Sequence, residues 1–275
     1  MKDMTIGDRM KFLEGEEAKR KFMPVLPICV RLDGKSFHSF CKGLKRPFDK
    51  RLSELMVGTT KFLVEESNAL IGYTQSDEIT LIIYSEDYKS QVYFDGRIQK
   101  IVSVLSSAAT AFFNSKLSEY LPEKANLLPK FDCRAWQVPN KVEAVNVLVW
   151  REQDAIKNSI SMAAQHYFSH KELQNKSGKE MQEMLFSREG VNWNDYPAFF
   201  KRGSYVKRVK SIRKFTVDEI DKLPKKHEAR SNPNLTVERS DIVACDLPPI
   251  VKIKNRVEYI FDNAEIKTRK EEKKL

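Results

Sequence analysis

Two apolar stretches that end in acidic residues constrain the fold of this chain more than any other feature of its sequence. In the first, apolar residues alternate over positions 26–32 and the stretch runs into Asp33 and Gly34, which is the period-2 pattern of a strand with one buried face. In the second, two apolar runs flank the polar residues 75–78, Gln-Ser-Asp-Glu, as in a β-hairpin with carboxylates at its tip. Side by side, the two stretches would bring Asp33 and Asp77 together at one edge of a sheet.

Carboxylates that meet at a sheet edge indicate a cation-binding site. Like charges at close range are costly unless a cation lies between them. Oxygen ligands of this kind favour Mg²⁺, which binds one or two carboxylates together with substrate phosphates. Each motif alone has a simpler explanation, because Asp-Gly is a common turn and Ser-Asp-Glu a common solvated hairpin tip. The pair is more informative, and we take Asp33, Asp77 and the adjacent Glu78 as the candidate catalytic residues.

The charge balance indicates the class of partner. The 275 residues include 48 Lys and Arg against 38 Asp and Glu, a formal net charge of +10. A protein this basic tends to bind phosphate polyanions, with nucleic acid ahead of a membrane surface. Many basic proteins bind neither, so the charge shifts the odds only modestly. No stretch approaches the roughly 20 apolar residues of a membrane span.

Cysteine usage and the first residues predict the compartment. The four cysteines, at 29, 41, 133 and 245, form no CxxC pair, so neither a zinc site nor a disulfide framework is indicated. Residues 1–21 are charged throughout and have no apolar centre, unlike a signal peptide. We therefore expect a cytoplasmic protein without a membrane partner.

The order of the predicted elements gives the fold class. Residues 24–138 contain the first strand, a helix that begins near Asp49, a hairpin over 71–84, an amphipathic helix over 98–117 and a strand over 130–138. This βαββαβ order is the split βαβ, ferredoxin-like arrangement of an α+β protein. Polymerase palms and nucleotidyl cyclases use it with two acids at one sheet edge. The fold alone does not fix the function.

The segments outside this palm-like domain are expected to be helical or basic. Residues 1–23 predict a helix on the surface of the main domain. Residues 139–275 predict an RNA-contacting region with a long helix, a second helix, a basic strand or hairpin, a mobile loop and a charged tail. These five segments span, in the same order, 141–169, 178–186, 201–217, 219–240 and 267–275.

Gly34-Lys35-Ser36 resembles the end of a phosphate-binding P-loop. The full motif needs a second glycine upstream, and that position is Cys29, inside the predicted strand. We therefore reject the P-loop. Backbone N–H groups after Gly34 can still cradle a triphosphate, with Lys35 and His38 as side-chain contacts.

Two other pairs of side chains have ligand-like spacing. His166 and His170 stand four residues apart, as two metal ligands on one helix face would, but no third ligand follows, which favours a polar helix face. Arg97 and Lys100 begin the helix predicted over 98–117. A helix N-terminus with added positive charge is suited to binding phosphate. A simpler explanation, that both side chains are solvated surface residues, is about equally good.

Taken together, these motifs resemble the tRNA-His guanylyltransferase superfamily of 3′–5′ nucleotide-adding enzymes. The matching pieces run in order across roughly residues 24–206, and Phe-Asp-Cys-Arg at 131–134 is similar to the family's Phe-Asp-Gly-Arg strand. They are Val30 to His38, Tyr73 to Glu78, Phe131 to Arg134, Trp150-Arg151 with Asp154, Leu185-Phe186, and Tyr196-Pro197 through Gly203.

The resemblance implies a reaction and its ligands. Acids matching Asp33 and Asp77 bind two Mg²⁺ ions in this family, and the backbone carbonyl matching Gly34 is a further ligand. ATP activates a tRNA 5′ monophosphate as a 5′-adenylylated RNA, and the 3′-hydroxyl of an incoming nucleotide, typically GTP, then attacks that 5′ phosphate. The family also implies a homotetramer. The nucleotide-binding residues implied are Asp33, Gly34, Lys35, Ser36, Phe37, His38, Ser76 and Asp77.

Basic residues near the matched motifs are the candidate contacts to RNA or phosphate. They come from the loop after the first strand, the second palm helix, the 130–138 strand and the basic segment after 200. They are Lys45, Arg97, Lys100, Arg134, Lys201, Arg202, Lys207 and Arg208.

Departures from the family pattern refine the expected substrate. Members that add the extra guanosine to tRNA-His carry His-Ile-Asn-Asn, tied to reading the His anticodon, where this chain has Ile-Lys-Asn-Ser at 156–159. A family lysine near Met181 is also missing, and Ser36 replaces the usual Asn in the triphosphate loop, which bears on nucleotide preference. We therefore expect the like-protein branch, which uses the complementary strand as template to rebuild truncated tRNA 5′ ends.

Three alternatives remain. The first is tRNA-His-specific addition of one guanosine. The second is a nucleotidyl cyclase on the same palm, which would leave the basic segment after residue 200 without a purpose. The third is a non-catalytic RNA-binding module, whose sheet should show exposed stacking aromatics rather than Asp33, Asp77 and Glu78.

Overall fold

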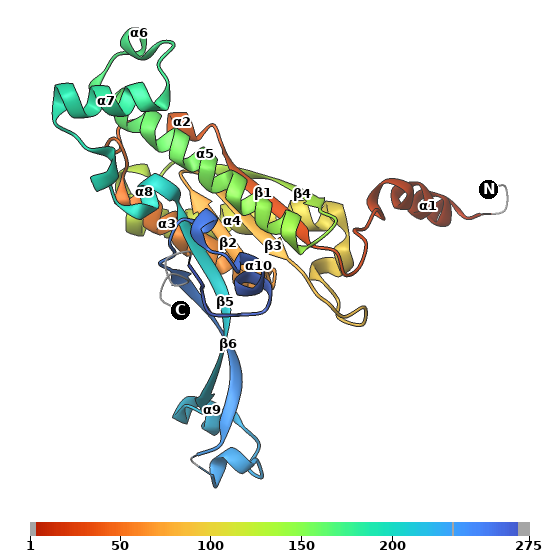
Figure 1. The fold of residues 1–275 in the computed structure, drawn as a ribbon. Coiled ribbons are helices and arrows are strands. Elements are labelled where there is room, and N and C mark those ends of the chain that lie inside the picture. Colours follow the sequence, from red (N-terminus) through yellow and green to blue (C-terminus); the bar gives the residue numbers. More distant parts are fainter. Residues whose placement is uncertain (1–3, 233, 269–275) are drawn as a thin grey trace.

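One six-stranded antiparallel sheet organises the protein (Figure 1). The computed structural model describes residues 4–232 and 234–268. The strand order is β4-β1-β3-β2-β5-β6, and its first four strands have the predicted split βαβ order. The strands are β1 Ile28–Lys35, β2 Ile71–Gln75, β3 Glu78–Ile83, β4 Lys130–Gln137, β5 Ser204–Lys214 and β6 Thr236–Cys245.

Two helices cover one face of this sheet. α3 (Lys50–Glu66) begins at Asp49, whose side chain accepts a hydrogen bond from the Arg51 N–H, as an N-cap residue does. α4 (Ile98–Tyr120) buries every fourth residue from Ile101 to Leu117. These stripes pack with the β1 and β3 residues of the same face into one apolar core, so the two predicted palm helices are confirmed.

A single long helix, α5 (Lys141–Tyr167), covers the other face. Its N-cap is Asn140, which accepts from the Glu143 N–H, and its buried residues form a second core with β1, β2 and β3. The predicted long helix is therefore confirmed. Val142 is 52% exposed because it lies on the outer side of the first turn.

Strands β5 and β6 form a ribbon that leaves the sheet. Residues 204–207 of β5 pair with β2, whereas the rest of β5 pairs with β6 alone. Figure 1 shows the ribbon extending away from the body with α9 (Val217–Lys222) at its far end. The prediction of a mobile loop over 219–240 is wrong, because this segment completes α9 and begins β6.

The N-terminal helix and the remaining helices are short. α1 (Ile6–Ala18) stands off from the body in Figure 1. The prediction that it lies on the main domain is wrong, because its apolar side chains are exposed and Gly15 is its one buried residue. The others are α2 Phe37–Phe40, α6 His170–Leu173, α7 Gly178–Glu189, α8 Ala198–Arg202 and α10 Arg256–Phe261.

The structure also bears on the histidine pair, on the predicted charged tail and on membrane spans. His166 lies in the last turn of α5 and His170 begins α6, so they do not share one helix face. Thr268 bridges to Ile253, and the rest of the predicted charged tail, 269–275, lies outside the described residues. None of the helices described is long and apolar enough to cross a membrane.

Candidate active site

The structure brings the two acidic motifs together at one sheet edge, as the sequence pattern predicts. In the β1–β3 register Asp33 lies opposite Glu78, and on the other side of β1 it lies opposite Asp132 of β4. The Gly34 N–H donates a 3.1 Å hydrogen bond to the Asp77 carbonyl. This bond ties the hairpin tip to the end of β1.

A two-residue loop sets the direction of Asp77. Gln75 and Glu78 are a pair in the β2–β3 register, which leaves only Ser76 and Asp77 between the strands. Ser76 has a φ of 55°, and positive φ values are what the tight hairpin turns require. The turn therefore holds the Asp77 carboxylate at the tip, next to Asp33.

Residues 35–39, at the end of β1 and the start of α2, are exposed except for Phe37. Ser36 has a left-handed backbone (φ 59°, ψ 31°) and begins α2. Lys35, Ser36 and His38 are exposed. Phe37 is buried against the rings of Phe40, Phe113 and Phe131. Phe37 therefore offers a nucleotide only its backbone, and its ring anchors the loop to the core.

Asp77 carries a negative charge without a cationic partner. Burial first, and the charge of Asp33 second, raise the pKa of Asp77 to about 6. No lysine or arginine within residues 4–232 and 234–268 forms an ion pair with it. Asp33 lies 3.9 Å from the Arg134 guanidinium, which also pairs with Asp132 at 3.2 Å. The edge is thus short of positive charge at Asp77.

Glu78 has a different environment from the two aspartates. Both of its oxygens accept from Arg151 of α5, at 2.6 Å from Nε and 2.7 Å from Nη2, and Arg151 also donates to Asp154 at 2.8 Å. Burial raises the pKa of Glu78, and Arg151 opposes that shift. Glu78 therefore also fixes α5 to the edge, and its catalytic role stays a prediction. Arg151 was part of the family resemblance but was not predicted as a site residue.

The donor set at this edge fits Mg²⁺. Asp33 and Asp77 are two carboxylates that are not fully paired, and the carbonyl of Gly34 lies beside them. The described part of the chain brings together no group of three or more His, Cys, Asp or Glu residues that could hold a metal. Mg²⁺ needs no such group, because waters and substrate phosphates complete its octahedral shell, whereas a structural zinc site would require one.

The predicted phosphate-binding residues do not all lie near this edge. Phe131, opposite Gly34 in the sheet, donates its backbone N–H to the hydroxyl of Thr110 in the middle of α4. Arg97, at the start of α4, lies about 20 Å back along the helix axis, and Lys100 lies one turn further on. Both belong to the opposite end of the sheet from Asp33. Their contact with RNA stays a prediction that involves another part of the molecule.

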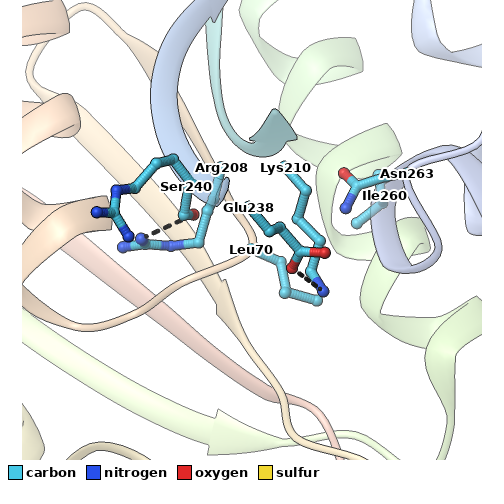
Figure 2. Close-up of a pocket in the computed structure, with 8 residues that line it drawn as sticks. Leu70, Arg208, Lys210, Glu238, Ser240, Ile260 and Asn263 are labelled. Atoms are coloured by element: carbon cyan, nitrogen blue, oxygen red, sulfur yellow. Dashed lines mark hydrogen bonds and ion pairs between the residues drawn. The ribbon is translucent and has the colours of Figure 1, made fainter. Parts of the chain in front are cut away.

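The two predicted RNA contacts on β5, Lys207 and Arg208, make contacts within the protein. Lys207 is buried, donates to Asn263 and lies over the Tyr259 ring, which argues against its predicted role. Figure 2 shows Arg208 among the residues that line a pocket at the base of the ribbon. The volume of this pocket is about 200 Å³. The Arg208 guanidinium donates to Ser240 and to the Val64 carbonyl, so it closes the end of α3.

Three other residues predicted to contact RNA are exposed or half-buried. Lys45 is exposed beside α3, and its backbone N–H donates to Asp49. Lys201 and Arg202 end α8, where they donate to the carbonyls of Asn194 and Leu247. Their contact with RNA remains a prediction.

A split βαβ sheet with two acids at one edge, beside an exposed backbone loop, is the arrangement of palm-type nucleotidyl-transferring enzymes. Comparison with known proteins identifies the group more closely. A family model described as tRNAHis guanylyltransferase matches residues 7–139, and the Thg1 C terminal domain model matches residues 146–247. The chain therefore belongs to the tRNAHis guanylyltransferase family, whose members are nucleotidyltransferases.

Individual relatives agree with this assignment. The chain is 32% identical to the tRNA(His) guanylyltransferase of Saccharomyces cerevisiae over 72% of its own length and 91% of that protein's. A bacterial Thg1-like protein in complex with ATP superposes with a TM-score of 0.74 and 36% identity, covering 93% of this chain and 97% of that one. The crystal structure of the yeast enzyme gives a TM-score of 0.64 at 28% identity, over 78% and 99% of the two chains. The predicted family and fold are thus confirmed.

Proposed function

We propose that this chain is a Mg²⁺-dependent nucleotidyltransferase that extends tRNA 5′ ends in the 3′–5′ direction and rebuilds truncated ends on the template of the opposing strand. The observation that carries the proposal is the junction of Asp33 with the Asp77 hairpin tip through the Gly34 N–H bond of 3.1 Å. The solved complexes of bacterial Thg1-like proteins with ATP and with GTP support nucleoside triphosphates as ligands.

The residues at the edge have separate tasks in this reaction. Asp33, Asp77 and the Gly34 carbonyl would hold Mg²⁺, which when bound neutralises phosphate charge and lowers the pKa of an attacking hydroxyl. Backbone N–H groups of residues 36–38 would bind the triphosphate, with the exposed Lys35 side chain beside them. The oxygen of the 5′ phosphate first attacks the α-phosphate of ATP and displaces pyrophosphate, which leaves a 5′-adenylylated RNA. The 3′-hydroxyl of the incoming nucleotide then attacks the former 5′ phosphate and displaces AMP.

The segment at 156–159 supports repair over tRNA-His-specific addition. Ser159 is buried, and its hydroxyl lies 3.2 Å from the Lys201 carbonyl and 3.3 Å from the Trp193 indole nitrogen. Its hydroxyl therefore joins α5 to α8 and is not presented to an anticodon. Addition of a single guanosine to tRNA-His is the second candidate.

The decisive experiment uses purified protein, Mg²⁺, ATP and all four nucleoside triphosphates. The substrates are a tRNA that lacks one 5′ nucleotide and bears a 5′ monophosphate, and tRNA-His without its extra guanosine. Asp77→Ala is the matched inactive variant, because it removes one of the two edge carboxylates. We expect the wild-type protein alone to add the base complementary to the opposing nucleotide, with activity of Asp77→Ala reduced by about 10³-fold or more.

The alternatives predict other products. Addition of G to tRNA-His alone, whatever base lies opposite, would support the His-specific function instead. No adenylylated or extended RNA with any tRNA would overturn the proposal. We also propose that the protein works as a cytoplasmic homotetramer, for which sedimentation of the purified protein should give about four times the monomer mass of 31.9 kDa.

A further inference from the structure

Trp150 is an exposed aromatic residue on helix α5, next to residues of the helix that are buried against the sheet. Its side chain is 46% exposed, although its neighbours Leu148 and Glu152 are buried. The Arg151 guanidinium carbon lies 4.6 Å from the indole centroid and that of Arg31 lies 5.7 Å away. The ring is therefore held in place by two cations and still offers a large part of its surface to solvent.

Trp150 lies beside the catalytic edge, on the same face of the sheet. Side chains two residues apart on a strand share a face, about 7 Å apart, so Arg31 and Asp33 of β1 point to the same side. Arg31 is opposite Arg134 on β4, the end strand of the sheet. Arg31, Arg134 and Trp150 thus form a group next to Asp33, which we call the Trp150 platform.

The Trp150 platform contains unused hydrogen-bonding capacity. The Arg31 Nε atom is buried, and it has no hydrogen-bond partner among the residues that the structure describes. A buried donor without an acceptor is costly. Arg134 keeps a half-exposed guanidinium whose contacts are the carboxylates of Asp132 and Asp33. Guanidinium groups are well suited to phosphate.

We propose that Trp150 is a base-stacking residue, on which the base of one nucleotide lies while its phosphate is directed to Arg31 and Arg134. The inference rests on the proposed function, because it assumes that nucleotides bind at the Asp33–Asp77 edge. Stacking of a base on an aromatic side chain contributes about 1–3 kcal/mol and accepts every base. The nucleotide is either the free triphosphate or the 5′-terminal residue of the RNA, and the two sources share this chemistry.

Fluorescence of Trp150 tests the contact directly. Trp136→Phe with Trp193→Phe leaves Trp150 as the one tryptophan of the three in the chain. This protein is titrated with GTP, with ATP and with the shortened tRNA, each in Mg²⁺, while binding is followed separately by calorimetry. Quenching by a triphosphate assigns the platform to the free nucleotide, and quenching by tRNA alone assigns it to the RNA 5′ end. Unchanged fluorescence at concentrations where calorimetry shows binding would overturn the proposal.

Substitutions of Trp150 distinguish base stacking from a second possible role, in which the ring only shields the Arg151–Glu78 ion pair from water. Trp150→Phe keeps a ring, and Trp150→Leu keeps apolar cover without one. We expect Trp150→Leu to raise the Kd of the stacked ligand about tenfold, Trp150→Phe to raise it less than threefold, and both to keep a melting temperature close to that of the wild type. Equal affinity of Trp150→Leu and wild type, in protein that still extends tRNA, would overturn the stacking role alone. If the wild-type protein itself does not extend tRNA, that result would instead count against the proposed function.

Discussion

At the scale of single residues, Gly34 links the core to the catalytic edge. A Cβ at this position would lie 2.3 Å from Cδ2 of the Phe37 ring, and that ring is fixed among Phe40, Phe113 and Phe131. We expect Gly34→Ala to lower the free energy of unfolding by about 1–3 kcal/mol, because the ring or the strand must move. Since Asp33 precedes it, triphosphate binding should weaken as well. Denaturant unfolding and calorimetry measure both effects.

Gly58 is the matched control for this substitution. It lies within α3, and the nearest atom to an added Cβ there is 3.9 Å away on Phe112. Gly58→Ala should raise stability by up to about 1 kcal/mol, because alanine favours helix, and should leave triphosphate affinity unchanged. A Gly34→Ala protein as stable and as tight-binding as Gly58→Ala would contradict the close packing described for Phe37.

At the scale of elements, the buried carboxyl of Glu152 joins three parts of the fold. It accepts from the Tyr205 hydroxyl of β5 and from the Ile250 N–H, both at 2.9 Å, so α5 is tied to the sheet and to the segment before α10. Burial is the largest effect on its pKa, which is raised above the ordinary value, while the two hydrogen bonds oppose that shift. The charged form therefore costs stability in the folded protein.

The raised pKa of Glu152 predicts how the stability difference between the wild type and Glu152→Gln depends on pH. A carboxyl with a raised folded pKa binds protons more readily in the folded state, so its cost is present above that pKa and disappears as the pH falls toward the unfolded pKa. The amide has no such dependence. We expect wild type to gain stability relative to Glu152→Gln as the pH is lowered from 8 to 5, measured as the difference in free energy of unfolding. A difference that is constant with pH, or that changes in the opposite direction, would contradict this assignment.

The elements also show what sequence patterns predict and where they fail. The palm helices were predictable because each has one buried face, so its apolar residues repeat at spacings of three or four. The palm strands were predictable as short apolar runs, which are buried on both faces of the sheet. Strand β6 has no such face. Most of it pairs with β5 in the ribbon, beyond the residues of β5 that pair with β2, and its residues are half-buried or exposed. The apolar pattern is therefore weak, although the Thr216–Glu219 capping box of α9 gave a local signal.

The residues of the candidate site also fall into those that the sequence predicts and those that it does not. Asp33 and Asp77 were predictable because each directly follows or precedes a strongly apolar strand. The burial of Lys207 was not, because it depends on Tyr259 and Asn263, more than fifty residues further along the chain. Likewise the pairing of Glu78 with Arg151 requires α5 to cross the sheet at one particular place. Such long-range contacts leave no periodic trace in one sequence.

At the scale of the whole molecule, the net charge of +10 should make RNA binding depend strongly on salt. A protein that neutralises phosphates releases condensed counterions, so its affinity for nucleic acid falls steeply with salt concentration. With roughly five phosphate contacts, the Kd for tRNA should rise on the order of 10²-fold or more between 50 and 200 mM KCl. Triphosphate binding should change much less, because Mg²⁺ and one compact ligand are involved.

Filter binding of tRNA and calorimetry of GTP, at a fixed Mg²⁺ concentration, measure the two dependences in the same buffers. Lys210→Gln is an informative variant, since this ribbon lysine is exposed and pairs with Glu238 at 2.9 Å. If the ribbon contacts phosphate, the variant should lower the slope of log Kd against log salt by about one and leave GTP affinity unchanged. If tRNA affinity changes less than threefold across the salt range, the basic surface does not carry RNA binding, and the edge carboxylates must bind the 5′ end largely through Mg²⁺.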